Sequence, residues 1–210
     1  MDVERLEEAL ASMKEYGFFV IKDYWSLEDC RKAVNELVRV PPSYFDTGQG
    51  GDLRLNRANK TLITARKFLE DKFIQEIANR YSNCSRADRI VAGIVKNQEG
   101  KNIDSGGGWH VDSQNKAQFK SFMYLSDVGS DSGPFTFIQK SKGLVNKLNT
   151  YENLRISQES IEDIFNPEDI IEITGSAGTC ILADSTYVHR GKQIEQGVRY
   201  TYTNYFYDLT

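Results

Sequence analysis

The sequence lacks any long hydrophobic run. No stretch approaches the roughly 20 consecutive apolar residues that are needed to span a bilayer. The N-terminal segment MDVERLEEALASMKEYG alternates charged and apolar residues, which is unlike the apolar core of a secretory signal. We therefore expect neither membrane insertion nor secretion, and we expect a cytoplasmic protein.

Cysteine is scarce, and neither charge sign dominates. The three cysteines, Cys30, Cys84 and Cys180, lie far apart without a CxxC pair, so we expect reduced thiols. The 30 acidic and 26 basic residues give a formal net charge of −4, and neither sign forms a long block. A polyanion-binding arm would need such a block, so nucleic acid is not an expected partner.

The length allows one substantial core. A chain of 210 residues with 40% hydrophobic residues is short for two independent domains, so we expect a single domain over residues 1–210. The sequence contains no internal repeat and no low-complexity tract.

Residues 1–82 have the pattern of a helical layer with loops. Helical spacing predicts a helix over residues 3–16, ended by the glycine that follows, and a second over about 26–38 with its serine as the cap. The apolar run 18–21 predicts a strand between them. Helical spacing returns over about 61–81, after a loop-rich segment.

The C-terminal part of the chain, residues 89–207, changes to a β pattern. Turn residues separate nearly all of its strand-like runs, and we expect these six strands: 89–96, 118–125, 135–138, 170–174, 179–183 and 198–207. They predict a mainly β fold, an antiparallel sandwich or jelly roll with the N-terminal helices packed outside it. The polar segment 143–169 is expected to form an excursion between strands.

The two histidines of the chain occur in unusual contexts, GGGWHVDS and DSTYVHRG. In an extended segment residues i and i+2 point to the same face, so His110 and Asp112 can reach one metal ion. His189 follows a predicted strand and can complete the set. Two imidazoles and one carboxylate on one face of an octahedron leave positions open, as in non-haem Fe(II) oxygenases. A pair of structural histidines and a turn aspartate is the alternative.

A basic residue follows His189 by ten positions, on the next predicted strand. Period-two alternation places Arg199, Thr201 and Thr203 on one face of that strand. A guanidinium with a hydroxyl group beside it suits the far carboxylate of a dicarboxylic acid. A cross-strand or surface ion pair is the alternative for Arg199.

Several segments together resemble the phytanoyl-CoA dioxygenase family in its broad sense. They are GGGWHVDS, QFKSFMYLSDV followed by SGPF, AGTCILADSTYVHRG followed by RYTYTNYF, and the opening GFFVIKDYWSLEDC. The resemblance covers residues 1–38, 89–142 and 170–207. It implies a cupin-like double-stranded β-helix (jelly roll), Fe(II) held by His110, Asp112 and His189, and 2-oxoglutarate whose far carboxylate pairs with Arg199.

The resemblance also suggests further pocket residues. In relatives the strand that corresponds to residues 118–125 lines the co-substrate pocket, which makes Gln118, Lys120 and Tyr124 candidates beside Thr201; a solvated strand face would explain them equally well. Arg54 and Arg57 lie in the loop-rich segment and are candidate substrate contacts, with a solvated charge cluster as the alternative. Trp109 is a third candidate, and its alternative role is core filling. If these arginines face the pocket, an anionic or polyhydroxylated small molecule would be expected, such as a sugar derivative.

The expected activity is that of an Fe(II)- and 2-oxoglutarate-dependent dioxygenase. It would use O2 to hydroxylate an unactivated C–H bond of a small polar substrate and would release succinate and CO2. Two alternatives stay open. One is desaturation, cyclisation or epimerisation at the same iron site, and the other is a non-catalytic jelly-roll module that binds metal or 2-oxoglutarate.

Overall fold

The computed structural model describes residues 2–47, 52–83, 87–97, 107–112, 118–144, 150–151 and 155–206. The helices are α1 (Val3–Tyr16), α2 (Leu27–Leu37), α3 (Ile63–Leu69), α4 (Lys72–Ser82) and α5 (Gln158–Ile164). The strands are β1 (Phe18–Ile21), β2 (Asp46–Thr47), β3 (Leu53–Asn56), β4 (Ala87–Lys96), β5 (Phe119–Tyr124), β6 (Phe135–Ile138), β7 (Thr150–Tyr151), β8 (Arg155–Ile156), β9 (Ile170–Ile173), β10 (Cys180–Asp184), β11 (His189–Gly191) and β12 (Val198–Phe206).

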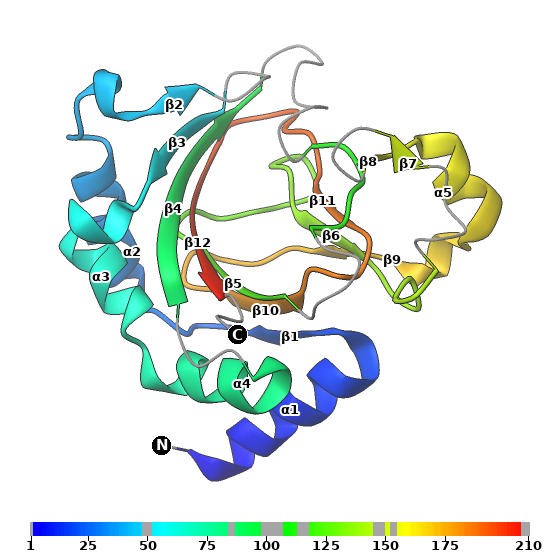
Figure 1. Ribbon diagram of the computed structural model, residues 1–210. Coiled ribbons are helices and arrows are strands. Elements are labelled where there is room, and N and C mark those ends of the chain that lie inside the picture. The colour runs from blue at the N-terminus through cyan, green and yellow to red at the C-terminus, as the bar shows by residue number, and fades with distance from the viewer. Residues whose placement is uncertain are drawn as a thin grey trace.

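Two antiparallel sheets face each other (Figure 1). In the described part of the chain, the larger sheet has the strand order β1-β10-β5-β12-β4-β3-β2 and the smaller one has the order β11-β6-β9. Their facing sides pack around Phe135, Phe137, Ile173 and Ile181 at one end of the space between them. The predicted fold class, a jelly roll with helices outside, is confirmed.

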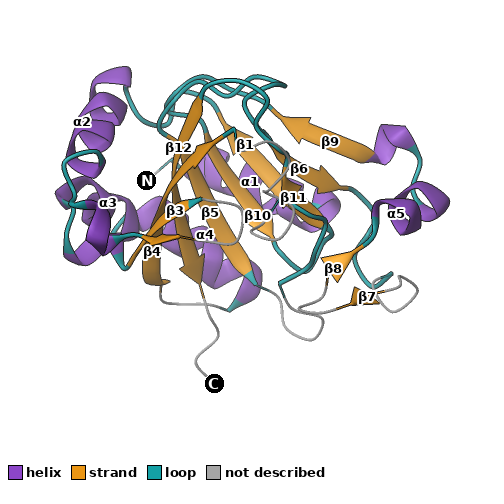
Figure 2. Ribbon diagram, turned by 90° about the horizontal axis from the view of Figure 1, so that it is seen from above, coloured by secondary structure: helices purple, strands orange, loops and turns teal. Residues whose placement is uncertain are grey.

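The N-terminal helices cover the outer face of the larger sheet (Figure 2). Their buried side chains form one hydrophobic cluster with Ile90, Ala92, Phe119, Met123 and Tyr202, which point away from the smaller sheet. This packing explains the alternation in β5 and β12, since every second residue faces helices. Helix α5 lies on the opposite side of the molecule.

The helix boundaries follow from capping. Gly17 ends α1 with φ 84°, and the Ser26 side chain caps α2 by accepting from Asp29 N, both as predicted. The helical spacing over about residues 61–81 corresponds to two helices, α3 and α4. Asp71 accepts hydrogen bonds from Phe73 N and Ile74 N and so starts α4 where a continuous helix would have run through.

The larger sheet contains strands that the sequence pattern did not separate from loop. Residues Leu53–Asn56, expected in the loop-rich segment, form β3, which pairs with β4. β1 pairs with β10 at the other edge. The segment 143–169 contains β7, β8 and α5 between β6 and β9. Among the described residues, none of the helices combines the length and the apolar character needed to cross a membrane.

Candidate functional site

The backbone brings the two histidines together on the smaller sheet. His110 and His189 form an antiparallel bridge in which each N–H donates to the other residue's carbonyl, at 3.0 and 2.9 Å. Asp112 N donates to Ser185 O at 3.0 Å. The segment around His110 is also held from its other side, because Ile156 N of β8 donates to Trp109 O at 2.9 Å. The excursion therefore helps to fix the first histidine.

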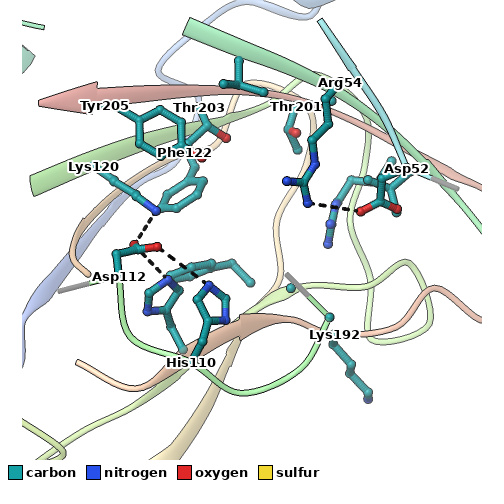
Figure 3. Close-up of a pocket in the computed structure, with 18 of the residues that line it drawn as sticks. Asp52, Arg54, His110, Asp112, Lys120, Phe122, Lys192, Thr201, Thr203 and Tyr205 are labelled. Carbon is teal, nitrogen blue, oxygen red and sulfur yellow. Dashed lines mark ion pairs between the residues drawn. The ribbon is translucent and has the colours of Figure 1, made fainter. Parts of the chain in front are cut away.

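The three predicted ligand side chains converge on one point (Figure 3). Their ligand atoms all lie within 4.8 Å of one another. The Nε2 atoms of His110 and His189 lie 3.9 and 3.4 Å from oxygens of the Asp112 carboxylate. This spacing suits a single ion between the three groups.

Backbone carbonyls orient both imidazoles. His110 Nδ1 lies 2.8 Å from Gly108 O, and His189 Nδ1 lies 2.9 Å from Tyr187 O. A carbonyl can only accept, so each Nδ1 carries a proton, and each Nε2 is the ring nitrogen that faces Asp112. This orientation leaves Nε2 of each imidazole as the atom that could bind a metal ion.

The electrostatics keep the site ready for a cation. Burial, and after it the adjacent His189, lower the pKa of His110 to about 3, so this imidazole is neutral at pH 7. Burial alone would raise the pKa of Asp112, but Lys120 and His189 outweigh it and hold the pKa well below its usual range. The Lys120 ammonium contacts the Asp112 carboxylate directly. Two imidazoles and a carboxylate form a donor set that suits a divalent transition metal.

The site opens into a cavity of about 470 Å³ between the sheets. The wall on the larger sheet consists of alternate residues of neighbouring strands, as the pairing requires. Thr201 of β12 lies opposite Gly93 of β4 and Tyr124 of β5, and Gly93 lies opposite Arg54 of β3. At Gly93 an added Cβ would come within 2.9 Å of Thr201 Oγ1, so glycine there keeps this part of the cavity open.

Arg199 lies in this cavity with a donor that has no partner. Its Nε is buried and forms no hydrogen bond within the described part of the chain. Burial lowers the pKa of Arg199, while Tyr124 and Asp52 act in the opposite direction. A buried guanidinium donor without a partner favours an anionic ligand, because leaving it unpaired costs free energy. The cavity can thus hold a carboxylate at Arg199 in addition to a metal ion at the histidines.

The structure brings most of the other predicted site residues to the cavity wall. Arg54, Lys120, Tyr124 and Thr201 line it. Lys120 contacts the carboxylate of Asp112, one of the predicted metal ligands. The Tyr124 hydroxyl donates to Ile173 O at 2.9 Å and accepts from Phe135 N at 2.8 Å, so it joins the two sheets and only its ring faces the cavity.

Three predicted residues lie away from the cavity. Trp109 points opposite to His110 into a separate apolar cluster, where its Nε1 donates to Gln158 at 2.8 Å. Gln118 precedes β5, beyond Lys120, and its carbonyl accepts from Ser185 N. Arg57 follows β3 in the left-handed conformation, with φ 54°, and is exposed.

Sequence reasoning missed other wall residues, which include Asp52, Arg89, Phe135, Arg155, Lys192 and Tyr205. Strand alternation could have found two of them. Tyr205 continues the face of Arg199, Thr201 and Thr203, and Arg89 lies on β4 directly opposite Tyr205. No local pattern marks Arg155, because it reaches the site through long-range pairing of β8 with the His110 segment.

The sequence matches no protein-family model and no curated protein, so membership of the phytanoyl-CoA dioxygenase family stays a prediction. Solved structures resemble the fold. The epimerase SnoN, in complex with Fe3+, alpha ketoglutarate and nogalamycin RO, has TM-score 0.73 and 16% identity, covering 100% of this chain and 86% of that chain. HygX from Streptomyces hygroscopicus, with nickel and 2-oxoglutarate bound, has TM-score 0.73 and 15% identity, covering 96% and 87%. The carbocyclase SnoK from nogalamycin biosynthesis has TM-score 0.71 and 15% identity, covering 96% and 83%. The chain therefore has the fold of these non-haem, 2-oxoglutarate-dependent enzymes.

Proposed function

We propose that this chain is an Fe(II)- and 2-oxoglutarate-dependent dioxygenase. The observation that carries the proposal is the pairing, in one cavity, of a two-histidine, one-carboxylate donor set with the buried guanidinium of Arg199. The fold shared with SnoN and HygX, whose structures hold a metal ion and 2-oxoglutarate, supports it.

Each residue has a defined task in this proposal. His110 and His189 bind Fe(II) through Nε2, and Asp112 binds it through its carboxylate. Arg199 pairs with the far carboxylate of 2-oxoglutarate, with the Thr201 hydroxyl beside it. When bound, iron, 2-oxoglutarate and O2 supply oxidation of an unactivated C–H bond, together with decarboxylation of 2-oxoglutarate to succinate and CO2. The protein positions the substrate carbon and limits water at the site.

Hydroxylation of a small molecule is the outcome that we propose first. We propose that the substrate is an anion or a sugar derivative. Membership of the phytanoyl-CoA dioxygenase family is part of the same proposal. Epimerisation or cyclisation at the same iron site is the second candidate, because the similar folds include an epimerase and a carbocyclase. Analysis of products by mass distinguishes the two, since hydroxylation adds an oxygen atom and epimerisation leaves the mass unchanged.

An anaerobic titration tests the cofactor pair. Fe(II)-loaded protein is titrated with 2-oxoglutarate while the visible spectrum is followed for the weak charge-transfer band of bidentate chelation. We expect a band for the wild type and a strongly raised 2-oxoglutarate requirement for Arg199→Ala, with metal binding retained. Arg66→Ala, on the outer surface of α3, is the matched control. Metal binding without any band would favour the non-catalytic module.

Removal of a ligand tests the metal site separately. We expect His189→Ala to lose Fe(II) binding and turnover, because two remaining ligands hold a divalent ion poorly. Metal content after dialysis and succinate release give the two readouts. An iron-replete and active variant would remove His189 from the ligand set.

A further inference from the structure

The neighbours of the two histidines meet behind the metal site. His110 and His189 lie opposite each other in an antiparallel bridge. Trp109 directly precedes the first histidine, and Arg190 directly follows the second. Because adjacent residues of an extended chain point to opposite faces, Trp109 and Arg190 share the face that lies away from the cavity. The Arg190 guanidinium carbon lies 4.1 Å from the centre of the Trp109 ring, so the two side chains stack there.

One side chain of the excursion contacts both members of this stack. Gln158 is the first residue of α5. Its Oε1 accepts from Trp109 Nε1 at 2.8 Å and from Arg190 Nη1 at 3.4 Å. The Trp109 side chain is buried, and a buried indole N–H needs such an acceptor. A single oxygen atom thus joins the residues adjacent to both predicted histidine ligands.

The excursion holds Gln158 in place relative to the histidines. Ile156 N of β8 donates to Trp109 O at 2.9 Å, and α5 begins two residues later. Ser157 caps this helix by accepting from Ser160 N. Trp109 also packs in the same apolar cluster as Ile161 of α5, behind the smaller sheet (Figure 1). Gln158 therefore reaches the stack from an element that is itself anchored to the His110 segment.

The histidine rings follow any shift of these segments. The carbonyls that accept from the two Nδ1 atoms belong to Gly108 and Tyr187, each two residues before its histidine. A displacement of either segment therefore carries the imidazole and its carbonyl together, and it changes the separation of the two Nε2 atoms. Metal–ligand distances tolerate only about 0.2 Å of error. The contacts behind the histidines can thus affect metal binding without touching the metal.

Resting on the proposed function, we propose that Gln158 is a positioning residue of the metal site, which sets the relative placement of His110 and His189 through the stacked side chains of Trp109 and Arg190. It acts from outside the cavity. Loss of its oxygen should weaken metal binding and change the coordination geometry, while the protein stays folded.

Metal binding measures this role. Gln158→Met keeps the approximate length of the side chain and removes the oxygen. We expect Zn(II) to bind about three- to tenfold more weakly in competition with a metal dye, less than for a partner that contacts a ligand directly. The visible spectrum of the Co(II)-loaded protein should also shift, because it reports coordination geometry. Unchanged Zn(II) affinity overturns the proposal, as does a lowered urea midpoint of the metal-free protein with an unchanged Co(II) spectrum.

Glu162 supplies a matched control and a rescue. Its carboxylate accepts from Gln158 Nε2 at 2.8 Å, so Glu162→Met removes a hydrogen bond of Gln158 without removing Oε1, and it should bind Zn(II) as the wild type does. Exchange of the two residues, Gln158→Glu with Glu162→Gln, keeps an acceptor oxygen at position 158 and should restore affinity to within about twofold. Equal losses in Gln158→Met and Glu162→Met, or no restoration by the exchange, would contradict the role of the oxygen.

A double-mutant cycle tests the route through the stack. Arg190→Met should also weaken Zn(II) binding, and its effect should not multiply with that of Gln158→Met, because the two side chains act in one network. Strictly multiplicative losses would mean separate routes and overturn the proposal. Arg80→Met, which removes an exposed arginine of α4, is the matched control. If Gln158→Met fails to fold, unchanged Zn(II) affinity in Arg190→Met overturns the proposal by itself.

Histidine spectra separate this proposal from the proposed function. The chain has two histidines, so selective isotopic labelling of histidine for NMR, in untagged metal-free protein, reports on the two predicted ligands alone. Gln158→Met should shift the imidazole resonances of both, and Glu162→Met should leave them unchanged. Failure of the wild type to bind Zn(II) and 2-oxoglutarate contradicts the proposed function, and the resonances then still decide the positioning role. Normal loading of the wild type with identical resonances in Gln158→Met overturns the positioning role alone.

Discussion

At the scale of single residues, Lys120 is an unusual neighbour for a metal ligand. It is buried, with 5% of its side chain exposed, and its ammonium contacts the Asp112 carboxylate. In the metal-free protein this ion pair neutralises a carboxylate between the two sheets. A metal ion and the ammonium therefore compete for the same negative charge.

Replacing Lys120 by Met should change two properties in opposite directions. The metal-free protein should lose about 1–3 kcal/mol of unfolding free energy, because the partly buried Asp112 is left without its ammonium partner. Affinity for Zn(II) should rise by about tenfold or more, since the competing charge is gone and a tenfold change needs only about 1.4 kcal/mol. Denaturant unfolding in the presence of chelator and competition titration with a metal dye measure the two effects.

The control for this change is Lys140→Met. Lys140 also pairs with a carboxylate, Asp169 at 2.7 Å, but 78% of its side chain is exposed, so its loss should alter stability by no more than about 1 kcal/mol. Weaker Zn(II) binding by Lys120→Met would mean that the lysine orients Asp112 rather than competing with the metal.

At the scale of elements, the turn between β10 and β11 depends on one buried carboxylate. Asp184 ends β10 and is fully buried. Its oxygens accept from Thr186 N at 3.0 Å, Thr186 Oγ1 at 2.7 Å, Tyr81 OH at 2.7 Å and Lys142 Nζ at 2.9 Å. These bonds join the turn to α4 and to the segment after β6, and the turn leads directly to His189.

The pKa of Asp184 predicts a pH-dependent stability. Burial alone would raise this pKa, but hydrogen bonds from Thr186 and Tyr81 outweigh it and lower the pKa below the ordinary value. A depressed folded-state pKa contributes stability above the unfolded-state pKa, and this stability is lost as pH falls through the folded value. Asp184→Asn should therefore cost about 1.5–3 kcal/mol at neutral pH, and the difference from wild type should shrink below about pH 4.

Urea unfolding at neutral and acidic pH measures this difference, with the exposed α5 residue Asp163 as the control. Asp163→Asn should give the same stability as the wild type at each pH, because its side chain is solvated. A constant gap between wild type and Asp184→Asn across the acid range would contradict a depressed pKa.

The elements also show which features the sequence could predict. Period-two alternation was sufficient for β12, because its inward residues face a cavity and its outward ones face helices. It predicted that Arg199 and Thr201 would share one face. Local patterns did not reveal β3, a short strand near the sheet edge that is held by pairing with β4. They also did not reveal that Asp71 caps α4 and so divides one helical pattern into two helices. Arg155 depends on pairing between distant segments, which no local window contains.

At the scale of the whole molecule, the two sheets hold different halves of the proposed site. His110 and His189 belong to the side of the smaller sheet, whereas Arg199 and Thr201 lie on the larger one. The Tyr124 hydroxyl is one direct link between the sheets near the cavity. A metal chelated by 2-oxoglutarate would add a second link, since the co-substrate would bind both the metal and Arg199.

This arrangement predicts coupled stabilisation by metal and co-substrate. A ligand that binds only the folded state at about 100 times its Kd adds about 2.7 kcal/mol, which raises Tm by about 5–10 °C for a chain of this size. We expect 2-oxoglutarate to raise Tm more with Zn(II) present than without it, and by reciprocity Zn(II) to bind tighter with 2-oxoglutarate. Arg199→Ala should keep the Zn(II) shift and lose most of the 2-oxoglutarate shift, while His189→Ala should lose the coupling. Thermal unfolding with each ligand alone and with both measures this, and strictly additive shifts would mean that the two ligands do not meet in the cavity between the sheets.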